Sequence, residues 1–195
     1  MINSVKPNLI VSDSRGAWFR ATILFILALI GTVGMWSVVV FIPDIEKEFG
    51  LDRGTSSLLY AFTMIGFGFG TVVIGKVYDK FGIKKPILLA TFVLITSYYF
   101  YSIFPFYWQL LILQFFMGFA ASAFFGPAMA DISNFFNKQR GFALSIVASA
   151  NYVAGATWPL LIGYFLTFID WRAAHFWISI CLFIMIPLIL LLKNA

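Results

Sequence analysis

The chain has 195 residues, of which 62% are hydrophobic and only 11% are charged. Its mean hydropathy of +0.95 is too high for a globular domain that presents a polar surface to water, so lipid is its expected solvent. The net charge of +5 does not indicate a nucleic-acid partner, because the basic residues stand between apolar runs instead of gathering into one patch.

Six apolar stretches follow one another along the chain. A helix that crosses a hydrocarbon core of about 30 Å needs roughly 20 residues, because it rises about 1.5 Å per residue. The sequence therefore predicts an all-α membrane protein with six transmembrane helices between a tail at 1–17 and a short end at 193–195. The expected spans cover residues 18–42, 55–74, 86–104, 107–130, 141–168 and 173–192.

The first stretch is longer than the apolar part of a signal peptide, and no small-residue cleavage site follows it. We therefore expect a helix that is retained, with disorder before Trp18. Basic residues are concentrated on one side of the predicted membrane, and the positive-inside rule makes that side, with both termini, cytoplasmic. They are Lys6, Arg15, Arg20, Lys76, Lys80, Lys84, Lys85, Lys138, Arg140 and Lys193, against Lys47, Arg53 and Arg172 on the other side.

The second stretch contains Gly66 and Gly70, a pair of small residues about one helical turn apart. Such a pair allows two helices to approach closely. It is compatible with a dimerisation face or with contact to a neighbouring helix of the same bundle, and we prefer the second interpretation.

The segment after the second stretch carries the most specific pattern in the chain. Residues 75–85 resemble the G-x-x-x-D-[RK]-x-G-x-[RK]-[RK] motif of the major facilitator superfamily, both in spacing and in their place between the second and third spans. The matching residues are Gly75, Asp79, Lys80, Gly82, Lys84 and Lys85. We expect Gly75 to permit close helix contact and Gly82 to permit a sharp turn.

The resemblance implies a fold and a mechanism. Members of the family ordinarily have twelve spans in two halves, and the chain is similar to the N-terminal half, a six-helix bundle built as a 3+3 inverted repeat. In the family the motif aspartate joins an interdomain charge cluster that stabilises the outward-open state. The resemblance therefore implies a gating role for Asp79, for Asp131 at the end of the fourth span and for Arg140. The lysines of the motif have a simpler alternative as positive-inside charges.

Residues 135–143, Pro159 and the segment 170–172 resemble the monocarboxylate-porter and oxalate/formate-exchanger branch of the superfamily. Asp170 departs from that pattern, because glycine is usual there. Gln114 stands where many proton-coupled drug exporters carry an arginine, which argues against proton-driven drug efflux. The resemblance implies a small organic solute as substrate, with a monocarboxylate or another organic anion as the specific expectation.

In this fold the substrate lies near the membrane midplane, and the first and fourth helices face the cavity. Polar and aromatic residues at that depth are the candidates for substrate contact: Trp36, Ser37, Tyr60, Thr63, Gln114, Ser122, Asn151, Tyr152 and Trp158. The amides of Gln114 and Asn151 are costly in hydrocarbon without a partner, so each is expected to bond a neighbouring helix or a substrate. For the aromatic residues, packing is the alternative. No charged residue lies near a predicted midplane, so the cation for a carboxylate would come from elsewhere.

The chain offers little for catalysis. Cys181 and His175 are its only cysteine and histidine, and no predicted span holds a carboxylate pair. These residues cannot assemble a disulfide, a zinc site or a catalytic triad within the chain, so we expect no metal, no cofactor and no enzymatic activity. We interpret His175 as a polar residue near the outer membrane interface.

Together the observations predict transport of a small organic solute across the plasma membrane by alternating access, with the lipid bilayer and the substrate as partners. The chain ends directly after the sixth span, so we expect a second six-span half from the same gene or from a separate chain. The alternatives are a truncated or split-gene product without transport activity alone, acting as a membrane scaffold or partner subunit, and a small channel.

Overall fold

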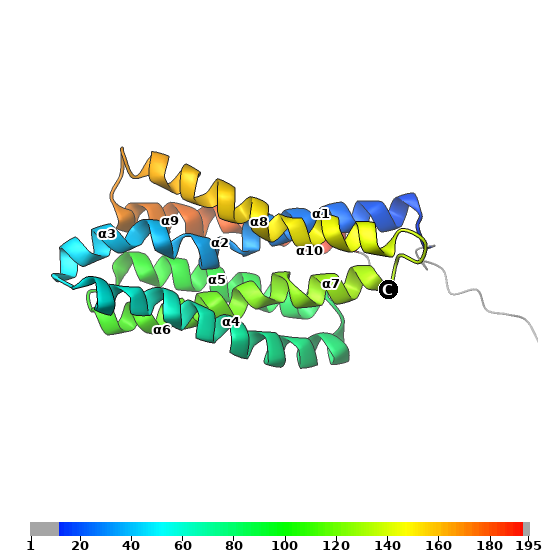
Figure 1. Cartoon of the computed structure of the whole chain (residues 1–195), viewed down its shortest axis with the longest axis horizontal. Helices are drawn as coiled ribbons and strands as arrows, with labels where there is room; N and C mark the ends of the chain where they lie inside the picture. The colour runs from blue at the N-terminus through cyan, green and yellow to red at the C-terminus, as the bar shows by residue number, and fades with distance from the viewer. Residues whose placement is uncertain (1–11, 193–195) are drawn as a thin grey trace, which may run out of the picture.

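The computed structural model describes residues 12–192, and these residues form helices and connecting segments without a strand. Within this part of the chain, six helical segments are long and apolar enough to cross a membrane. They lie side by side along the long axis of the molecule (Figure 1). The expected all-α, six-span fold is confirmed.

The first span is not one continuous helix. It consists of α1 (Arg15–Gly31), α2 (Val33–Trp36) and α3 (Val38–Phe49), with breaks at Thr32 and Ser37. The hydroxyl of Thr32 donates to the carbonyl oxygen of Ala28 at 2.7 Å, a local bond that competes with regular helix geometry and bends the chain. The first span is therefore divided near its middle.

The second and third spans are continuous helices, α4 (Arg53–Phe81) and α5 (Lys84–Ile103). Asp52 caps α4, because its carboxylate accepts from the backbone N–H of Thr55 at 2.8 Å. Gly82 ends α4 with a φ of 72°, a conformation that favours glycine, and the chain turns there into α5. The expected sharp turn at Gly82 is present.

The second set of three spans repeats the pattern of a broken helix followed by a continuous one. The fourth span comprises α6 (Tyr107–Ala121), the 3₁₀ turn η1 (Ser122–Phe124) and α7 (Gly126–Ser133), and the fifth is α8 (Arg140–Phe165). The sixth comprises α9 (Trp171–Cys181), η2 (Leu182–Ile184) and α10 (Met185–Leu191), and the Asp170 carboxylate caps it. Broken first and fourth spans agree with an inverted 3+3 repeat.

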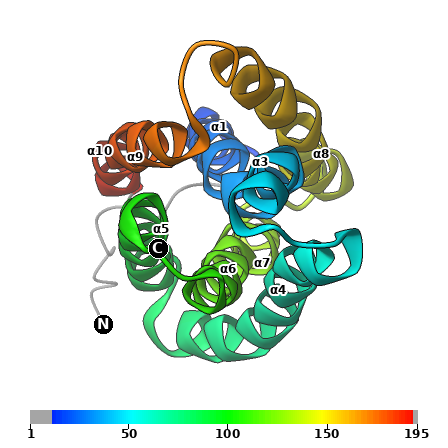
Figure 2. The ribbon, with the colours of Figure 1, turned by 90° about the vertical axis from the view of Figure 1, so that its left-hand side faces the viewer.

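An end-on view shows how the spans are arranged (Figure 2). The pieces of the first and fourth spans, α1, α3, α6 and α7, occupy the middle, α5 lies beside α9 and α10, and α4 and α8 lie at the outer edges. The buried apolar side chains form one core between these helices, with Phe41, Tyr98, Tyr101, Phe124 and Phe136 among its largest fully buried members.

The second and fourth spans pack backbone against backbone. A Cβ atom placed on Gly66 would lie 2.0 Å from the carbonyl oxygen of Phe115, and one placed on Gly118 would lie 1.9 Å from that of Thr63. Gly70 makes a similar approach to Phe119. Only glycine permits contacts this close, so the small pair of α4 contacts a neighbouring helix of the same bundle.

Some bounds and one glycine contact differ from the expectations, and α4, for example, continues to Phe81 instead of ending near residue 74. The first helix begins at Arg15 instead of Trp18, because Ser14 caps it through a bond from the backbone N–H of Ala17. The first span also continues through Pro43 to Phe49. A Cβ atom on Gly75 would meet nothing within 4 Å among residues 12–192, so the expected close helix contact is not made within this part of the chain. The rest of the expected tail, at 1–11, and the end at 193–195 lie outside the described residues.

Candidate functional site

The breaks in the first and fourth spans face each other inside the bundle. A Cβ atom on Gly31, at the end of α1, would lie only 2.4 Å from the ring of Phe124 in the 3₁₀ turn η1. Phe124 is buried, and its ring fills the space beside the break. In secondary transporters, interrupted helices of this kind commonly form the substrate site near the midplane.

Beside these breaks lies a polar pair that the bundle does not fully cover. The indole N–H of Trp36, at the end of α2, donates to the side-chain oxygen of Asn151 on α8 at 3.1 Å. Both residues are half-buried, and the indole also rests against Gly155, whose absent Cβ would lie 3.0 Å from it. Both residues were predicted to face the substrate cavity, and their hydrogen bond joins α2 to α8.

Three other predicted cavity residues lie inside the bundle. Gln114 on α6 accepts from the hydroxyl of Thr63 at 3.0 Å and donates to the hydroxyl of Tyr101 at 3.3 Å. The hydroxyl of Ser37, at the second break, bonds that of Tyr98 at 2.6 Å. All five side chains are buried. Of the two roles considered for Gln114, the structure shows the interhelical one.

The remaining predicted cavity residues are dispersed. The hydroxyl of Ser122 is buried and donates to the carbonyl oxygen of Phe119 in its own span. The indole N–H of Trp158 donates to the carbonyl oxygen of Leu29 at 2.8 Å, which ties α8 to α1. Tyr60 is half-buried, whereas Tyr152 is 72% exposed on α8.

A second cluster occupies the end of the bundle where α1 begins. Arg20 of α1 and Asp131 of α7 form a buried ion pair, with 2.6 Å between Nε and Oδ2 and 2.8 Å between Nη2 and Oδ1. The guanidinium carbon lies 4.5 Å from the centre of the Phe135 ring. A small cavity of about 300 Å³ adjoins the pair, and Tyr78 and Asn134, which are hydrogen-bonded to each other at 3.3 Å, also line it.

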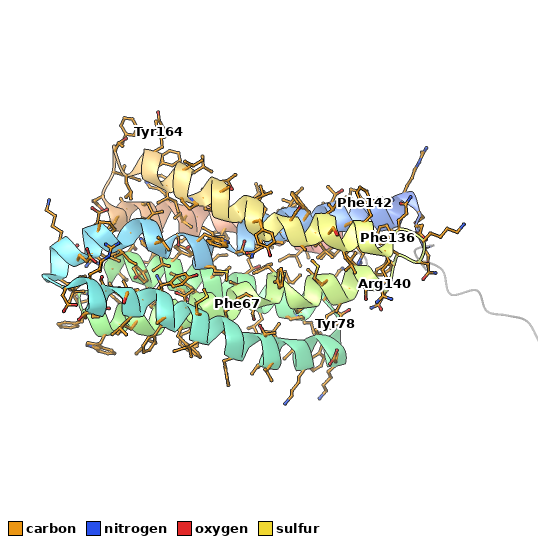
Figure 3. All side chains as sticks on the ribbon, viewed as in Figure 1. Phe67, Tyr78, Phe136, Arg140, Phe142 and Tyr164 are labelled. Carbon is orange, nitrogen blue, oxygen red and sulfur yellow. The ribbon has the colours of Figure 1, made fainter. Side chains whose placement is uncertain are left out.

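The residues of the 75–85 motif surround this end but do not all touch the ion pair. Asp79, Lys80 and Lys85 are exposed, Lys84 is half-buried, and Asp79 forms no ion pair with any residue among 12–192. Arg140 is also exposed, and Figure 3 places it at the same end of the bundle as Tyr78, Phe136 and Phe142. The structure thus gathers the predicted gating residues at one end, with Asp131 alone buried.

Arg20 was expected to be only an orienting charge near the membrane surface, yet it lies buried in the bundle. The sequence signal for its role was present but easily missed, since Arg20 lies within the first apolar stretch and Asp131 directly follows the fourth. Buried charges inside spanning helices must be paired, so two opposite charges in separate spans indicate a contact. The contact between Arg20 and Asp131 was not predicted from the sequence.

His175 is the second residue whose place differs from the expectation. It is fully buried instead of interfacial, with its ring stacked on Tyr101 at 4.3 Å and near Phe41 at 4.1 Å between ring centres. Its Nδ1 lies 2.7 Å from the carbonyl oxygen of Trp171, one turn earlier in α9. Because that oxygen can only accept, Nδ1 carries the proton, and Nε2 has no hydrogen-bond partner among the described residues.

At the opposite end of the bundle, residues of the segment 170–172 form an ion pair and hydrogen bonds with neighbouring elements. Arg172 pairs with Glu48 at 2.6 Å and donates to the carbonyl oxygen of Phe104 at 2.9 Å, while the indole of Trp171 donates to Glu48 at 2.8 Å. These bonds join the end of α3 to the start of α9 and to the turn after α5.

The histidine, cysteine and carboxylate side chains of the described residues do not gather at one place. Among residues 12–192, no group of three or more histidine, cysteine, aspartate or glutamate side chains is placed to hold a metal ion. The polar groups at the breaks are amides, hydroxyls and indoles, which bind by hydrogen bonding and stacking.

Comparison with known proteins agrees with the geometry. A family model of the Major Facilitator Superfamily matches residues 24–195. The chain belongs to this superfamily. The match extends over all six spans, so the superfamily assignment does not depend on the 75–85 motif alone.

Several curated transporters are similar in sequence. The inner membrane transport protein YnfM of Escherichia coli is 23% identical over 172 residues, which are 87% of this chain and 41% of YnfM. The uncharacterized MFS-type transporter YdgK of Bacillus subtilis is 26% identical over 88% of the chain and 44% of its own length. The agnestins efflux protein AgnL12 of Paecilomyces divaricatus is 26% identical over 77% of the chain and 35% of its own.

The chain thus spans less than half the length of each of these three relatives. The superfamily match and the six apolar helices of the described residues indicate a multi-pass membrane protein, and the names of two of these relatives describe transporters. The described residues therefore form a six-helix bundle that corresponds to one half of a major facilitator fold.

Proposed function

We propose that this superfamily member carries a small organic solute across the membrane by alternating access, together with a second six-helix half that completes the cavity. The observation that carries the proposal is the half-buried pair of Trp36 and Asn151 beside the breaks of the first and fourth spans. A second half packed against this face would enclose the pair near the midplane, where alternating-access transporters bind their substrates.

The specific substrate that we propose is a monocarboxylate or another organic anion. Support comes from the resemblance of residues 135–143 and 170–172 to the monocarboxylate-porter and oxalate/formate-exchanger branch. The described spans carry no charged side chain at the level of Trp36 and Asn151. In this proposal the second half supplies the cation that a carboxylate requires, and this half supplies hydrogen bonds and aromatic surface.

We also propose that both termini are cytoplasmic and that the membrane is the plasma membrane. The end of the bundle that holds Arg20, Asp79, Lys80, Lys84 and Lys85 is rich in basic residues, as the positive-inside rule requires of a cytoplasmic side. The gating role belongs to the same end. In this proposal the exposed Asp79 meets the second half when the transporter is open to the outside.

The test begins with the partner. The coding region after this chain, or next to it, is examined for a second six-span segment, and its product is co-expressed and purified with the chain. Uptake of radiolabelled lactate, formate and oxalate is then measured in proteoliposomes. We expect co-purification and saturable uptake of at least one of these anions, whereas a chain that purifies alone and transports none would contradict the proposal.

A pair of variants links uptake to the candidate site. Trp36→Phe keeps an aromatic ring but removes the N–H that holds Asn151, so we expect the half-saturating substrate concentration to rise about fivefold, the equivalent of one neutral hydrogen bond. Trp177→Phe, on the exposed face of α9, is the matched control and should leave uptake unchanged. Equal effects of the two variants would show that Trp36 is not part of the substrate site.

The alternative of a membrane scaffold without transport activity is not favoured, because the superfamily match and the named relatives all indicate transporters.

A further inference from the structure

A groove about 610 Å³ in volume runs along the outer face of α5, opposite α10. Its walls are apolar side chains, and it is lined chiefly by Leu88, Leu89, Phe92, Ile95, Phe183 and Ile186. The hydroxyls of Thr91 and Thr96, which also line it, donate to carbonyl oxygens of α5 itself, each at 2.9 Å. The floor of the groove therefore offers hydrocarbon contacts and no free polar group along its length.

One end of the groove is different, because Lys85 lines it. The ammonium group of Lys85 lies 4.5 Å from the centre of the Phe81 ring, and that of Lys80 lies 5.3 Å from the same ring. Neither lysine forms an ion pair with a carboxylate among residues 12–192. Two cations thus gather beside one aromatic ring at the mouth of an apolar groove.

The start of α5 strengthens this positive potential. Lys84 and Lys85 occupy its first turn, and that turn holds no acidic residue. The N-terminal end of a helix is already electropositive, so cations placed there repel the helix dipole and favour an approaching anion. A negatively charged group at the mouth would offset both effects.

The length of the groove matches one leaflet of a bilayer. Lys85 and Thr96, which lie at its two ends along α5, are eleven residues apart, and a helix rises about 1.5 Å per residue, so they are separated by about 16 Å. The hydrocarbon core of a bilayer is about 30 Å thick, and one leaflet contributes about half of it. An acyl chain that starts at the level of Lys85 would end near Thr96.

We propose that this groove binds one anionic phospholipid, with an acyl chain along α5 and the phosphate at Lys85 and Lys80. Basic pockets between transmembrane helices are known to hold the head groups of anionic lipids. Figure 2 shows α5 and α10, which line the groove, on the other side of the bundle from α8, the helix that carries Asn151. The lipid site therefore does not depend on the proposed substrate or on the partner half.

The test is native mass spectrometry of the purified full-length chain with phosphatidylglycerol or phosphatidylcholine of identical acyl chains. We expect one phosphatidylglycerol to remain bound at activation energies that remove phosphatidylcholine. Lys85→Gln should lower retention of phosphatidylglycerol about fivefold, since one basic residue near a membrane surface contributes that much to the affinity for anionic lipid. Lys47→Gln, at an exposed lysine of α3 at the opposite end, is the control and should have no effect.

A second variant tests the apolar part of the groove. Leu89→Trp fills the groove without changing charge, so it should reduce retention of phosphatidylglycerol although Lys85 is intact. Circular dichroism and size-exclusion profiles establish that each variant is folded. Equal retention of the two lipids, or equal effects of the Lys85 and Lys47 variants, would show ordinary annular lipid and overturn the proposal. A concentration-dependent dimer that excludes lipid would assign the groove to a second copy of the chain and overturn it as well.

Discussion

Arg20 and Asp131 lie 111 residues apart in the sequence, yet their side chains form a two-point ion pair buried between α1 and α7. The two helices belong to the first and fourth spans, which are the corresponding members of the two three-helix repeats. The pair therefore connects the repeats directly. Because both groups are held in a medium of low dielectric constant, the loss of either one leaves the other poorly compensated.

Replacement of Asp131 with asparagine is expected to destabilise the bundle by about 3–5 kcal/mol, the range found when one member of a buried pair is removed. The free energy of unfolding can be measured by titration with sodium dodecyl sulfate in mixed micelles. Asp79→Asn is the matched control, since Asp79 is exposed, and it should change the stability very little. The double variant Arg20→Met, Asp131→Leu should recover much of the loss. Equal stability of the Asp131→Asn and Asp79→Asn variants would contradict the stabilising role of the buried ion pair.

Gly66→Ala should destabilise the protein by about 1–3 kcal/mol, because the added Cβ must push α4 away from the backbone of α6. Gly68→Ala lies in the same helix, and its Cβ would meet nothing within 4 Å among the described residues, so it should be neutral or stabilise by up to about 1 kcal/mol. The same detergent titration compares the two. A similar change in stability for both variants would contradict the proposed packing role of Gly66.

The Asp13 carboxylate accepts the backbone N–H groups of Asn137, Lys138 and Gln139 at 3.1–3.3 Å and so ties the start of the chain to the segment between α7 and α8. Burial raises the pKa of this carboxyl, but these hydrogen bonds and the charge of Lys138 outweigh it, so the pKa lies below its ordinary value.

A lowered pKa in the folded state stabilises the contact at pH values above the unfolded pKa and loses that contribution as the pH falls through the folded pKa. We therefore expect the amides of residues 137–139 to be protected from hydrogen exchange at neutral pH and to lose protection below about pH 4, after correction for intrinsic exchange rates. Asp13→Asn should weaken the protection and remove its pH dependence. Asp52→Asn should leave these amides unaffected, because Asp52 caps α4 at the other end.

His175→Phe should change the stability by less than about 1 kcal/mol. The phenyl ring keeps the stack on Tyr101, and the lost bond to the Trp171 carbonyl is offset by removal of a buried nitrogen without a partner in the described structure. His175→Ala should cost about 3 kcal/mol, because it leaves a cavity among aromatic rings. Denaturant titration of both variants separates packing from hydrogen bonding. A large loss in the phenylalanine variant would show that the imidazole nitrogens are essential.

Asp79→Asn tests the gating role in the complex with a second half. A reporter is made by Tyr152→Cys in a Cys181→Ser background, because Tyr152 is exposed on α8, and its labelling by membrane-impermeant maleimide is followed from each side. Loss of one interdomain charge contact should shift the ratio of inward to outward accessibility about fivefold. Asp44→Asn, at the opposite end, should not shift it. Unchanged accessibility after Asp79→Asn would show that Asp79 has no gating role.

Much of the architecture could be predicted because it depends on local composition. The apolar stretches, the turn at Gly82 and the glycine pair of α4 each follow from the residues that form them, and the structure contains all three. The positions of Arg20 and His175 could not be predicted in the same way. Their burial depends on which helices pack beside them, and a hydropathy pattern does not contain that information.

The candidate site shows the same division. Sequence reasoning named Trp36, Gln114 and Asn151 but could not choose between interhelical bonding and an accessible cavity for the amides. Packing placed Gln114 in the bundle, bonded to Thr63 and Tyr101, and left the pair of Trp36 and Asn151 half-buried at the edge of the central helices. The sequence by itself determined that the chain is a six-helix membrane protein, because the cost of burying backbone polar groups in lipid leaves few other folds. Only the tertiary structure decided which polar groups satisfy one another, because those partners lie on helices far apart in the chain.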